Sequence, residues 1–217
     1  MPNNTKKPDH YFVPHPKSKP KFGVIRTYLR GKPLKFLTAS SVFSMKRVDL
    51  GTRLLIESMA LPEKGYVLDV GCGYGAVGIA AAASNPELHV VMVDVNARAV
   101  RLAKQNIKLN HVHNAEVRRG YLYEPVEKTT FNCILSNPPV SAGLDIVKAI
   151  ITEAPRHMED KATLQMVVKS KIGGKRLQII FEETFGNFFV IARKSGYRVL
   201  AAEKTSLSQH VQNGKEA

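Results

Sequence analysis

The residues best suited to chemistry lie in two short segments, each directly after an apolar run. The first segment is Asp69-Val70-Gly71-Cys72-Gly73-Tyr74-Gly75. Glycines at this spacing let the backbone turn sharply and approach a ligand closely, and a helix that follows them offers free N–H groups at its start. We therefore expect this glycine loop to bind a nucleotide-like cofactor.

Two cofactors compete for the glycine loop. Gly73-x-Gly75-x-x-Gly78 matches the dinucleotide fingerprint, and Asp94 follows it at the distance expected of the ribose-binding acid of an NAD site. That fingerprint should begin at the strand end, however, whereas here Gly71-Cys72 intervene and the acid Asp69 precedes them. A carboxylate there suits the ammonium and sulfonium of S-adenosylmethionine and repels a pyrophosphate. The loop favours S-adenosylmethionine, with NAD as the alternative; Asp94 would bind ribose in either case, or cap the helix expected near Asn96.

The second segment is Ser136-Asn137-Pro138-Pro139-Val140. Each proline lacks an N–H, and Pro138 restrains Asn137 to an extended conformation, so the turn is rigid. It can present the Asn137 side-chain oxygen and the Pro138 carbonyl as adjacent acceptors for the two hydrogens of an exocyclic amine. Accepting both bonds would orient the nitrogen lone pair toward a donor methyl and stabilise the positive charge that develops during attack. The segment predicts methyl transfer to a planar nitrogen, with Asn137, Pro138 and Pro139 as catalytic residues; the alternative is a proline-rich loop with a helix cap.

Short apolar runs alternate with helical patterns from Tyr66 onward, which is typical of a parallel sheet wrapped by helices. Expected helices begin after the N-cap Asp49, cover 96–109, and follow the fourth and fifth strands. The last two strands flank Lys194-Ser195-Gly196 as a hairpin, so the last strand should run antiparallel. The sequence predicts an α/β, Rossmann-like doubly wound seven-stranded sheet, mostly parallel, in which the strand ends bring both segments to one crevice. The expected strands are 66–70, 89–93, 115–119, 131–136, 163–168, 187–192 and 197–201.

Charge predicts a polyanionic partner. The 217 residues include 32 Lys and Arg against 18 Asp and Glu, a formal charge of +14. Residues 1–35 hold nine of the basic residues and one acid, Asp9. Such an excess favours nucleic acid, because each neutralised phosphate releases counterions. With 44% hydrophobic residues, the chain is expected to form one folded domain over residues 36–217, preceded by a proline-rich, basic flexible arm over 1–35.

Several classes of protein are disfavoured. Two cysteines, Cys72 and Cys133, support neither a disulfide scaffold nor a four-ligand zinc site, and His111 and His113 lack a partner at metal-ligand spacing. No apolar run approaches the roughly 18 residues of a membrane span, and the N-terminus lacks the apolar stretch of a secretory signal. The expectation is a cytoplasmic protein without a metal or membrane partner; its oligomeric state is not predicted.

Residues 36–200 resemble the class I methyltransferases of the ribosomal-RNA small-subunit guanine-N2 type, in a short single-domain form. The resemblance rests on Val42-Phe43-Ser44 ahead of Asp49-Leu50-Gly51-Thr52, on the run from Val67 to Gly75, on Asp94-Val95-Asn96 and on Ser136-Asn137-Pro138-Pro139. It implies S-adenosylmethionine as methyl donor and a guanine amine of RNA as acceptor. Larger members of that family carry a second, degenerate domain, and here the basic arm is the candidate RNA grip.

Two departures from the family pattern alter the expected site. In many amino-methyltransferases an aromatic residue after the second proline stacks on the target base, whereas this chain has Val140, so Phe43 becomes the candidate for stacking, with a core role as its alternative. Where an acid often binds the cofactor adenine, this chain has Gly120-Tyr121. Lys169 and Lys171 are candidates to bind RNA phosphates; the alternative is that they belong to a solvated loop without a binding role. The expected cofactor-binding residues are Asp69, Gly71, Cys72, Gly73, Tyr74, Gly75, Asp94, Val95, Asn96, Gly120, Tyr121 and Asn137; the expected substrate-binding residues are Phe43, Val140, Lys169 and Lys171.

The functional prediction is methyl transfer from S-adenosylmethionine to an exocyclic amine of an RNA base, with guanine N2 of ribosomal RNA first. Adenine N6, a tRNA, and the glutamine amide of a protein are alternative acceptors, because the Asn-Pro-Pro motif suits any planar nitrogen. An NAD-dependent oxidoreductase and a catalytically silent RNA-binding module are the more remote alternatives.

Overall fold

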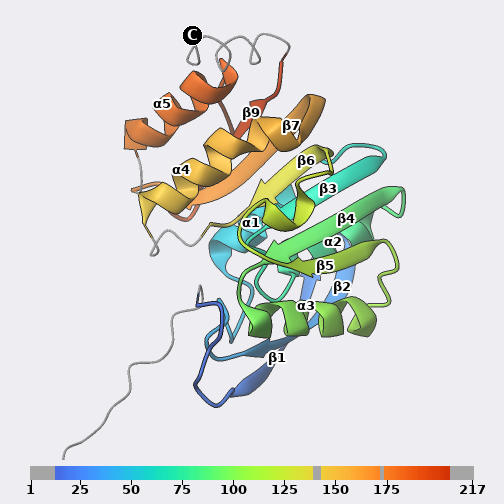
Figure 1. The fold of residues 1–217 in the computed structure, drawn as a ribbon. Coiled ribbons are helices and arrows are strands. Elements are labelled where there is room, and N and C mark those ends of the chain that lie inside the picture. The colour runs from blue at the N-terminus through green and yellow to red at the C-terminus, as the bar shows by residue number, and fades with distance from the viewer. Residues whose placement is uncertain (1–12, 139–142, 172–173, 206–217) are drawn as a thin grey trace, which may run out of the picture.

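The computed structural model describes residues 13–138, 143–171 and 174–205. Seven strands form one sheet in the order β5-β4-β3-β6-β7-β9-β8 (Figure 1). Strands β3 to β7 are parallel, and β9 runs antiparallel to both β7 and β8. The predicted doubly wound sheet with an antiparallel last strand is therefore confirmed. The strands are β3 (Gly65–Val70), β4 (Leu88–Asp94), β5 (Ala115–Arg119), β6 (Phe131–Ser136), β7 (Met158–Lys169), β8 (Phe189–Lys194) and β9 (Tyr197–Glu203).

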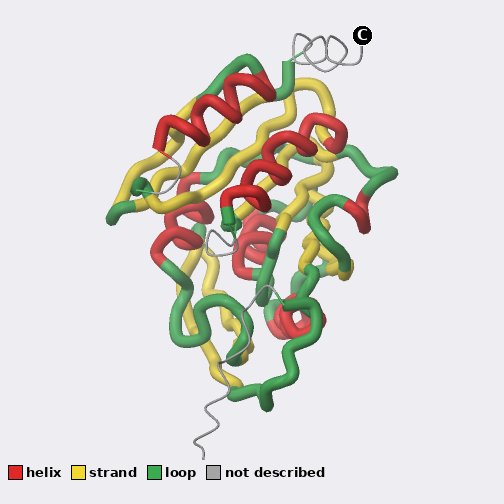
Figure 2. The backbone as a smooth tube through the Cα atoms, turned by 60° about the vertical axis from the view of Figure 1, so that its left-hand side comes forward, coloured by secondary structure: helices red, strands yellow, loops and turns green. Residues whose placement is uncertain are grey.

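Helices cover both faces of the sheet (Figure 2). Helices α1, α2 and α3 pack on one face of the sheet and form one apolar core with it. Helices α4 and α5 form a second core on the opposite face. Among the described residues no helix is long and apolar enough to cross a bilayer. The helices are α1 (Leu50–Ser58), α2 (Ala76–Ser84), α3 (Ala97–Leu109), α4 (Leu144–Glu153) and α5 (Gly174–Phe185), with short 3-10 turns at Glu124–Val126 and Ala154–His157.

Side-chain caps explain where two of these helices start. The Asp49 carboxylate accepts from the N–H groups of Gly51 and Thr52, and the Asn96 oxygen accepts from those of Arg98 and Ala99. Each cap satisfies N–H groups that lack a partner inside the helix. The predicted cap at Asp49 is confirmed, and the cap of α3 is Asn96 itself. Element ends differ from the predicted ranges chiefly at β7, which begins five residues earlier, and at β8, which begins two residues later.

Residues 22–39 form an antiparallel hairpin of β1 (Phe22–Leu29) and β2 (Lys32–Ala39), outside the main sheet. Its two-residue loop, Arg30-Gly31, has φ values of 45° and 75°, as a tight hairpin turn requires. Ile25, Leu29 and Phe36 bury their side chains in the same core as α1 to α3. The predicted flexible arm ending at residue 35 therefore differs from the structure, because alternate apolar side chains of residues 22–35 give the hairpin a buried face.

Helix α3 holds the free edge of β2 through two asparagines one turn apart. The Asn106 side chain accepts from Leu37 N at 2.7 Å and donates to Leu37 O at 2.9 Å, and Asn110 pairs in the same way with Lys35. These amides take the place of a neighbouring strand. Asn106, which is fully buried, also donates to Tyr74 O at 2.8 Å in the glycine loop. The hairpin and the glycine loop are thus fixed to the same side chain.

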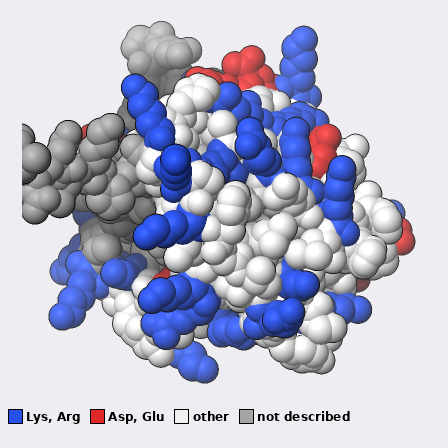
Figure 3. Space-filling model, turned by 90° about the horizontal axis from the view of Figure 1, so that it is seen from below, with Lys and Arg blue, Asp and Glu red and all other residues white. Residues whose placement is uncertain are grey.

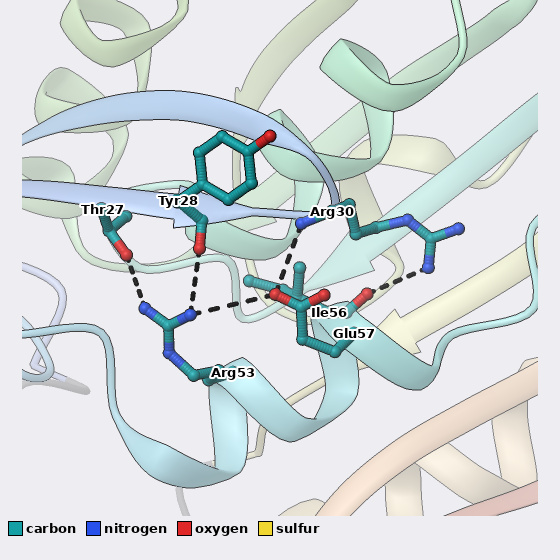
Figure 4. Close-up of polar contacts among 6 residues, drawn as sticks. All are labelled: Thr27, Tyr28, Arg30, Arg53, Ile56 and Glu57. Atoms are coloured by element: carbon teal, nitrogen blue, oxygen red, sulfur yellow. Dashed lines mark hydrogen bonds and ion pairs between the residues drawn. The ribbon is translucent and has the colours of Figure 1, made fainter.

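Helix α1 holds the hairpin from the other side (Figure 4). The Arg53 guanidinium donates to Tyr28 O at 3.0 Å and to Thr27 Oγ1 at 2.5 Å. At the hairpin turn, the Arg30 guanidinium donates to Ile56 O at 3.0 Å, while the Arg30 backbone N–H donates to the Glu57 carboxylate. Arg30 of the hairpin turn and Arg53 of α1 therefore attach the hairpin to the domain.

Loss of the Asn106 amide should loosen the hairpin. Asn106→Ala leaves the polar atoms of Leu37 and Tyr74 without their partner in a buried setting, so we expect the free energy of unfolding to fall by roughly 2–4 kcal/mol. Asn110→Ala, at a partly exposed position, should cost about 1 kcal/mol. Urea denaturation measures both, and amide exchange at Leu37 should accelerate in the first variant. Equal losses in the two variants would contradict this role of Asn106.

Candidate active site

A cleft of about 340 Å³ opens at the carboxyl ends of the parallel strands. It lies at the centre of the sheet, where the chain order reverses between β3 and β6, which is the usual ligand site of open α/β sheets. The glycine loop after β3 and Asn137 after β6 both line it. The described residues that line the cleft are Pro14, Val42, Phe43, Thr52, Asp69, Val70, Gly71, Cys72, Gly73, Tyr74, Ala76, Val77, Val93, Asp94, Val95, Ala99, Gly120, Tyr121, Leu122, Asn137, Pro138, Ile146 and Ile150.

Several backbone N–H groups of the glycine loop donate hydrogen bonds within the protein. Gly71 N and Cys72 N donate to Val93 O, and Gly73 N donates to the Asp94 carboxylate at 2.8 Å. Gly73 has a φ of 59°, a left-handed conformation that glycine adopts without strain. Three N–H groups of the loop are therefore already engaged within the protein, and they are not available as donors to a pyrophosphate. Close backbone approach is the contribution that these glycines retain.

Helix α2 packs tightly on β4 behind the loop. A side chain at Gly78 would come within 2.4 Å of Met92 Cγ, so a residue without one is required there. Gly78 N donates to Asp69 Oδ2 at 2.9 Å. The Asp69 carboxylate, held in this orientation, lines the cleft. Burial raises the pKa of Asp69 from 3.8 to about 7, opposed by the Gly78 hydrogen bond and assisted by the charge of Asp94.

Asp94 stands at the end of β4 and uses both carboxylate oxygens. Oδ2 accepts from Gly73 N, and Oδ1 accepts from Asn96 N at 2.8 Å. Burial raises the pKa of Asp94, and its two backbone hydrogen bonds oppose the shift. A carboxylate has about four acceptor positions, so two remain for hydroxyl groups of a ligand in the cleft.

The Asn137 side chain is oriented by a hydroxyl from α1. Asn137 Nδ2 donates to Thr52 Oγ1 at 2.8 Å, which leaves Asn137 Oδ1 as an acceptor for other donors. Thr52 is itself fixed, because its N–H donates to the capping carboxylate of Asp49, and Asp49 accepts from Tyr197 Oη at 3.3 Å. Pro138 is buried and lines the cleft beside Asn137. The predicted Asn-Pro turn therefore opens onto the same cleft as the glycine loop.

The N-terminal segment passes the mouth of this cleft. Pro14 lines it, and Pro14 O accepts from Ala97 N at 3.1 Å at the start of α3. The Arg98 guanidinium donates to Ser18 O and Ser40 O, while Arg119 contacts His15 at 2.7 Å. The basic residues of α3 and β5 thus hold residues 14–18 against the strand ends.

Most of the predicted site residues meet in the cleft. Phe43 is half-buried there, beside Val42, and Gly120 and Tyr121 form part of the wall. Gly75 and Asn96 instead cap α2 and α3, and neither lines the cleft. Lys169 and Lys171 are exposed at or just past the end of β7 and also lie outside the lining. Pro139 and Val140 lie outside the described residues.

Thr52 and Pro14 are lining residues that form hydrogen bonds at the site and were not predicted as site residues from the sequence. Thr52 carries a usable signal, because a hydroxyl in the first turn of a capped helix is held in a fixed direction, but nothing local connects it to Asn137. Pro14 carries none, since it lies in a segment predicted to be flexible. Among the described residues no group of His, Cys, Asp and Glu is arranged to hold a metal ion.

The geometry of the cleft fits S-adenosylmethionine better than NAD. The buried Asp69 carboxylate, the partly buried Asp94 carboxylate and a mainly apolar wall suit a ligand with positive charge, hydroxyls and a flat apolar base. This sheet order with a reversed β9, and this cleft, define a class I S-adenosylmethionine-dependent methyltransferase. The chain belongs to the methyltransferase small domain family, whose model matches residues 33–201. An NAD-dependent oxidoreductase finds no support in that family.

Three proteins with similar sequences or structures indicate what the chain resembles. It is 37% identical to the uncharacterized protein YbxB of Bacillus subtilis, over 90% of this chain and 98% of that protein. It is 32% identical to ribosomal RNA small subunit methyltransferase C of Hamiltonella defensa, over 86% of this chain and 56% of the relative. Its fold matches the T. thermophilus 16S rRNA N2 G1207 methyltransferase (RsmC), solved in complex with AdoMet and guanosine, with a TM-score of 0.77 at 26% identity.

Coverage differs between these matches. The T. thermophilus alignment spans 87% of this chain and 52% of that chain. The chain therefore spans nearly all of YbxB but about half the length of the ribosomal RNA methyltransferases that it matches.

The pKa of Asp69 predicts how stability depends on pH. The folded state keeps this proton up to about pH 7, while the unfolded carboxyl loses it near 3.8, so the folded state binds more protons between those values. The free energy of unfolding of the cofactor-free protein should therefore fall as pH rises through that window. Asp69→Asn should flatten the profile and be more stable than the parent above pH 7, by roughly 1–4 kcal/mol.

Urea denaturation across that pH range measures the effect. Asp145→Asn, which removes an exposed carboxylate from α4, is the matched control and should leave the profile unchanged. A profile that stays as steep in Asp69→Asn as in the parent would assign the dependence to other groups.

Proposed function

We propose that this protein transfers a methyl group from S-adenosylmethionine to the exocyclic amine of a base in RNA, with guanine N2 of ribosomal RNA as the first candidate. The observation that carries the proposal is the orientation of Asn137, whose amide nitrogen is tied to Thr52 so that its oxygen is left to accept within the cleft. The names of the relatives support the RNA: two are ribosomal RNA methyltransferases, and one was solved with guanosine.

The glycine loop and the two carboxylates are the proposed cofactor site. Asp94 would accept from the ribose hydroxyls through its two remaining acceptor positions. Asp69 would favour the positively charged end of the cofactor, which in turn would lower the pKa of this carboxyl toward its ordinary value. Gly120, Tyr121 and Val95 give an apolar wall for the adenine without a side-chain carboxylate. When bound, S-adenosylmethionine supplies an electrophilic methyl group on a sulfonium.

Asn137 and Pro138 are the proposed catalytic residues. The Asn137 oxygen and the Pro138 carbonyl would each accept one N–H of the target amine, which orients its lone pair at the methyl group. Both acceptors also stabilise the positive charge that the nitrogen gains during transfer. Thr52 acts through Asn137 as a positioning residue, because it holds the amide in the rotation that directs oxygen, rather than nitrogen, toward the amine. Pro139 and Val140 stay in this proposal on the sequence motif alone.

Phe43 is the proposed stacking partner of the target base. It lines the cleft together with Asn137 and Pro138, and it replaces the aromatic residue that the family pattern expects at Val140. Lys169 and Lys171, exposed at the carboxyl end of β7, would then bind phosphates of the RNA outside the cleft. A net charge of +14 agrees with such a partner, and a cytoplasmic location follows from a ribosomal RNA substrate.

Asn137→Ala should lower the rate of methyl transfer to RNA by about 10²–10³-fold or more, because an acceptor used in the transition state is lost. The affinity for S-adenosylhomocysteine, measured by calorimetry, should stay nearly unchanged. Asn132→Ala removes an asparagine from the opposite end of the same strand, β6, and should retain activity. Full activity in Asn137→Ala would exclude the proposed chemistry.

Mass spectrometry of nucleosides from RNA treated with labelled donor identifies the product. We expect N2-methylguanosine; a methyl group on adenine N6 or on a protein glutamine would instead assign the alternative acceptors.

Substitution of Thr52 should separate positioning from binding. Thr52→Val removes the hydroxyl that accepts from Asn137 at similar volume, so kcat should fall by about tenfold while KM for RNA changes little. Thr52→Ser keeps the hydroxyl and should recover most of the turnover. If valine and serine lower kcat equally, the effect comes from packing of α1 and not from the orientation of Asn137.

A further inference from the structure

We propose that the outer face of the β1–β2 hairpin is a platform for single-stranded RNA that leads away from the methylated base. The inference rests on the proposed function for the nature of the partner. It concerns a surface outside the cleft, formed by Phe22, Val24, Arg26 and Tyr28 of β1 with Lys35 of β2, which we call the hairpin platform.

The hairpin platform exposes apolar side chains that the fold does not use. Along β1 the residues alternate, with Ile25 and Leu29 buried and their neighbours directed outward. Phe22, Val24 and Tyr28 are 69%, 50% and 64% exposed. The hairpin is already held by its inner face, by Asn106 and Asn110 at the edge of β2, and by Arg53 at β1. Among the described residues, the contacts that attach the hairpin to the domain therefore do not involve the outer rings.

Cations stand between the two aromatic rings. Arg26 is exposed on the same face of β1, two residues from Tyr28 and four from Phe22, and its cross-strand partner is Lys35, so both side chains share the outer face. Rings that stack on bases, interleaved with cations that meet phosphates, are the chemistry by which proteins bind single-stranded nucleic acid without relying on sequence. A duplex would hide its bases from these rings, which is why the platform favours an unpaired strand.

The register of the hairpin connects the platform to the cleft. Phe22 pairs with Ala39, and the chain then enters the cleft wall at Val42 and Phe43. Phe22 therefore marks the cleft end of the platform and Tyr28 the far end, about 20 Å along the strand. A strand with one base in the cleft could continue over the hairpin for several nucleotides.

The surroundings of the platform are basic. Figure 3 views the molecule from the side where β1 and α3 lie, and Lys and Arg are spread over this face, with few acidic residues among them. On α3, Arg101, Lys104 and Lys108 are exposed. A second copy of this chain would bring Arg26 and Lys35 against like charges, which disfavours self-association and favours a polyanion.

The test compares paired aromatic variants. Phe22→Ala/Tyr28→Ala should weaken binding to a fluorescently labelled single-stranded RNA by about tenfold or more, measured by anisotropy in the presence of S-adenosylhomocysteine. Binding to a blunt RNA duplex should change far less. The matched control, Tyr66→Ala/Phe189→Ala, removes two aromatic residues that are 47% and 54% exposed elsewhere on the surface and should keep the single-strand affinity within about twofold.

The charge of the platform is tested separately. Arg26→Gln/Lys35→Gln should flatten the dependence of log affinity on log salt by about one unit, because roughly 0.7 counterions are released for each phosphate neutralised on a single strand. An unchanged salt slope would remove these two residues from the platform. Thermal unfolding and S-adenosylhomocysteine affinity of every variant must match the parent, so that a loss reports the surface and not misfolding.

Three outcomes would overturn the proposal. Unaltered single-strand affinity in Phe22→Ala/Tyr28→Ala excludes the platform, and an equal loss in the control pair makes it nonspecific. If sedimentation shows that these substitutions convert a dimer to a monomer with the same affinity per chain, the surface belongs to a second copy. The proposed function fails separately: RNA that gains no methyl group from the parent protein, yet loses affinity in the aromatic variant, leaves the platform standing and removes only the methylation.

Discussion

A single buried amide joins the hairpin to the glycine loop that lines the cleft. Asn106 pairs with both backbone groups of Leu37 in the hairpin and donates to Tyr74 O in the glycine loop, from a position without exposure to solvent. An unpaired polar group in such a setting costs about as much as a whole helix cap, so the three partners must stay together. The hairpin, α3 and the glycine loop are therefore held together as one unit.

The cleft is lined by two carboxylates whose negative charges are only partly stabilised by hydrogen bonds from the protein. Asp69 and Asp94 lie at the ends of neighbouring strands, β3 and β4, and burial raises the pKa of each. Backbone N–H groups of Gly78 and Gly73 relieve this in part. A cationic ligand in the cleft would compensate these charges, whereas a pyrophosphate would add further negative charge. The hydrogen bonds that shape the loop also engage the N–H groups of Gly71, Cys72 and Gly73, which a pyrophosphate could otherwise have used.

The strands could be predicted because apolar runs bury both faces of a parallel sheet, and the cleft followed from where those strands end. The hairpin was not predicted because the outer face of β1 is itself largely apolar, with Phe22, Val24 and Tyr28 beside Arg26, which obscures the alternation that buries Ile25 and Leu29. Thr52 and Asn137 are 85 residues apart, so their hydrogen bond is a product of tertiary packing that no local pattern encodes. Asn106 likewise resembles an ordinary polar residue of a helix until β2 is laid against it.

Rigid attachment of the hairpin bears on how a small domain could position a large RNA. This chain spans about half the length of the ribosomal RNA methyltransferases that it matches, and under the proposed function the hairpin platform gives the matched domain a surface of its own for RNA. A flexible arm would raise affinity through charge but leave the target base to find the cleft by diffusion. A hairpin fixed by Asn106 to the proposed cofactor-binding loop would instead hold any strand lying on it at a constant distance from the methyl donor. Binding energy from the hairpin can then contribute to orientation of the reacting amine as well as to affinity.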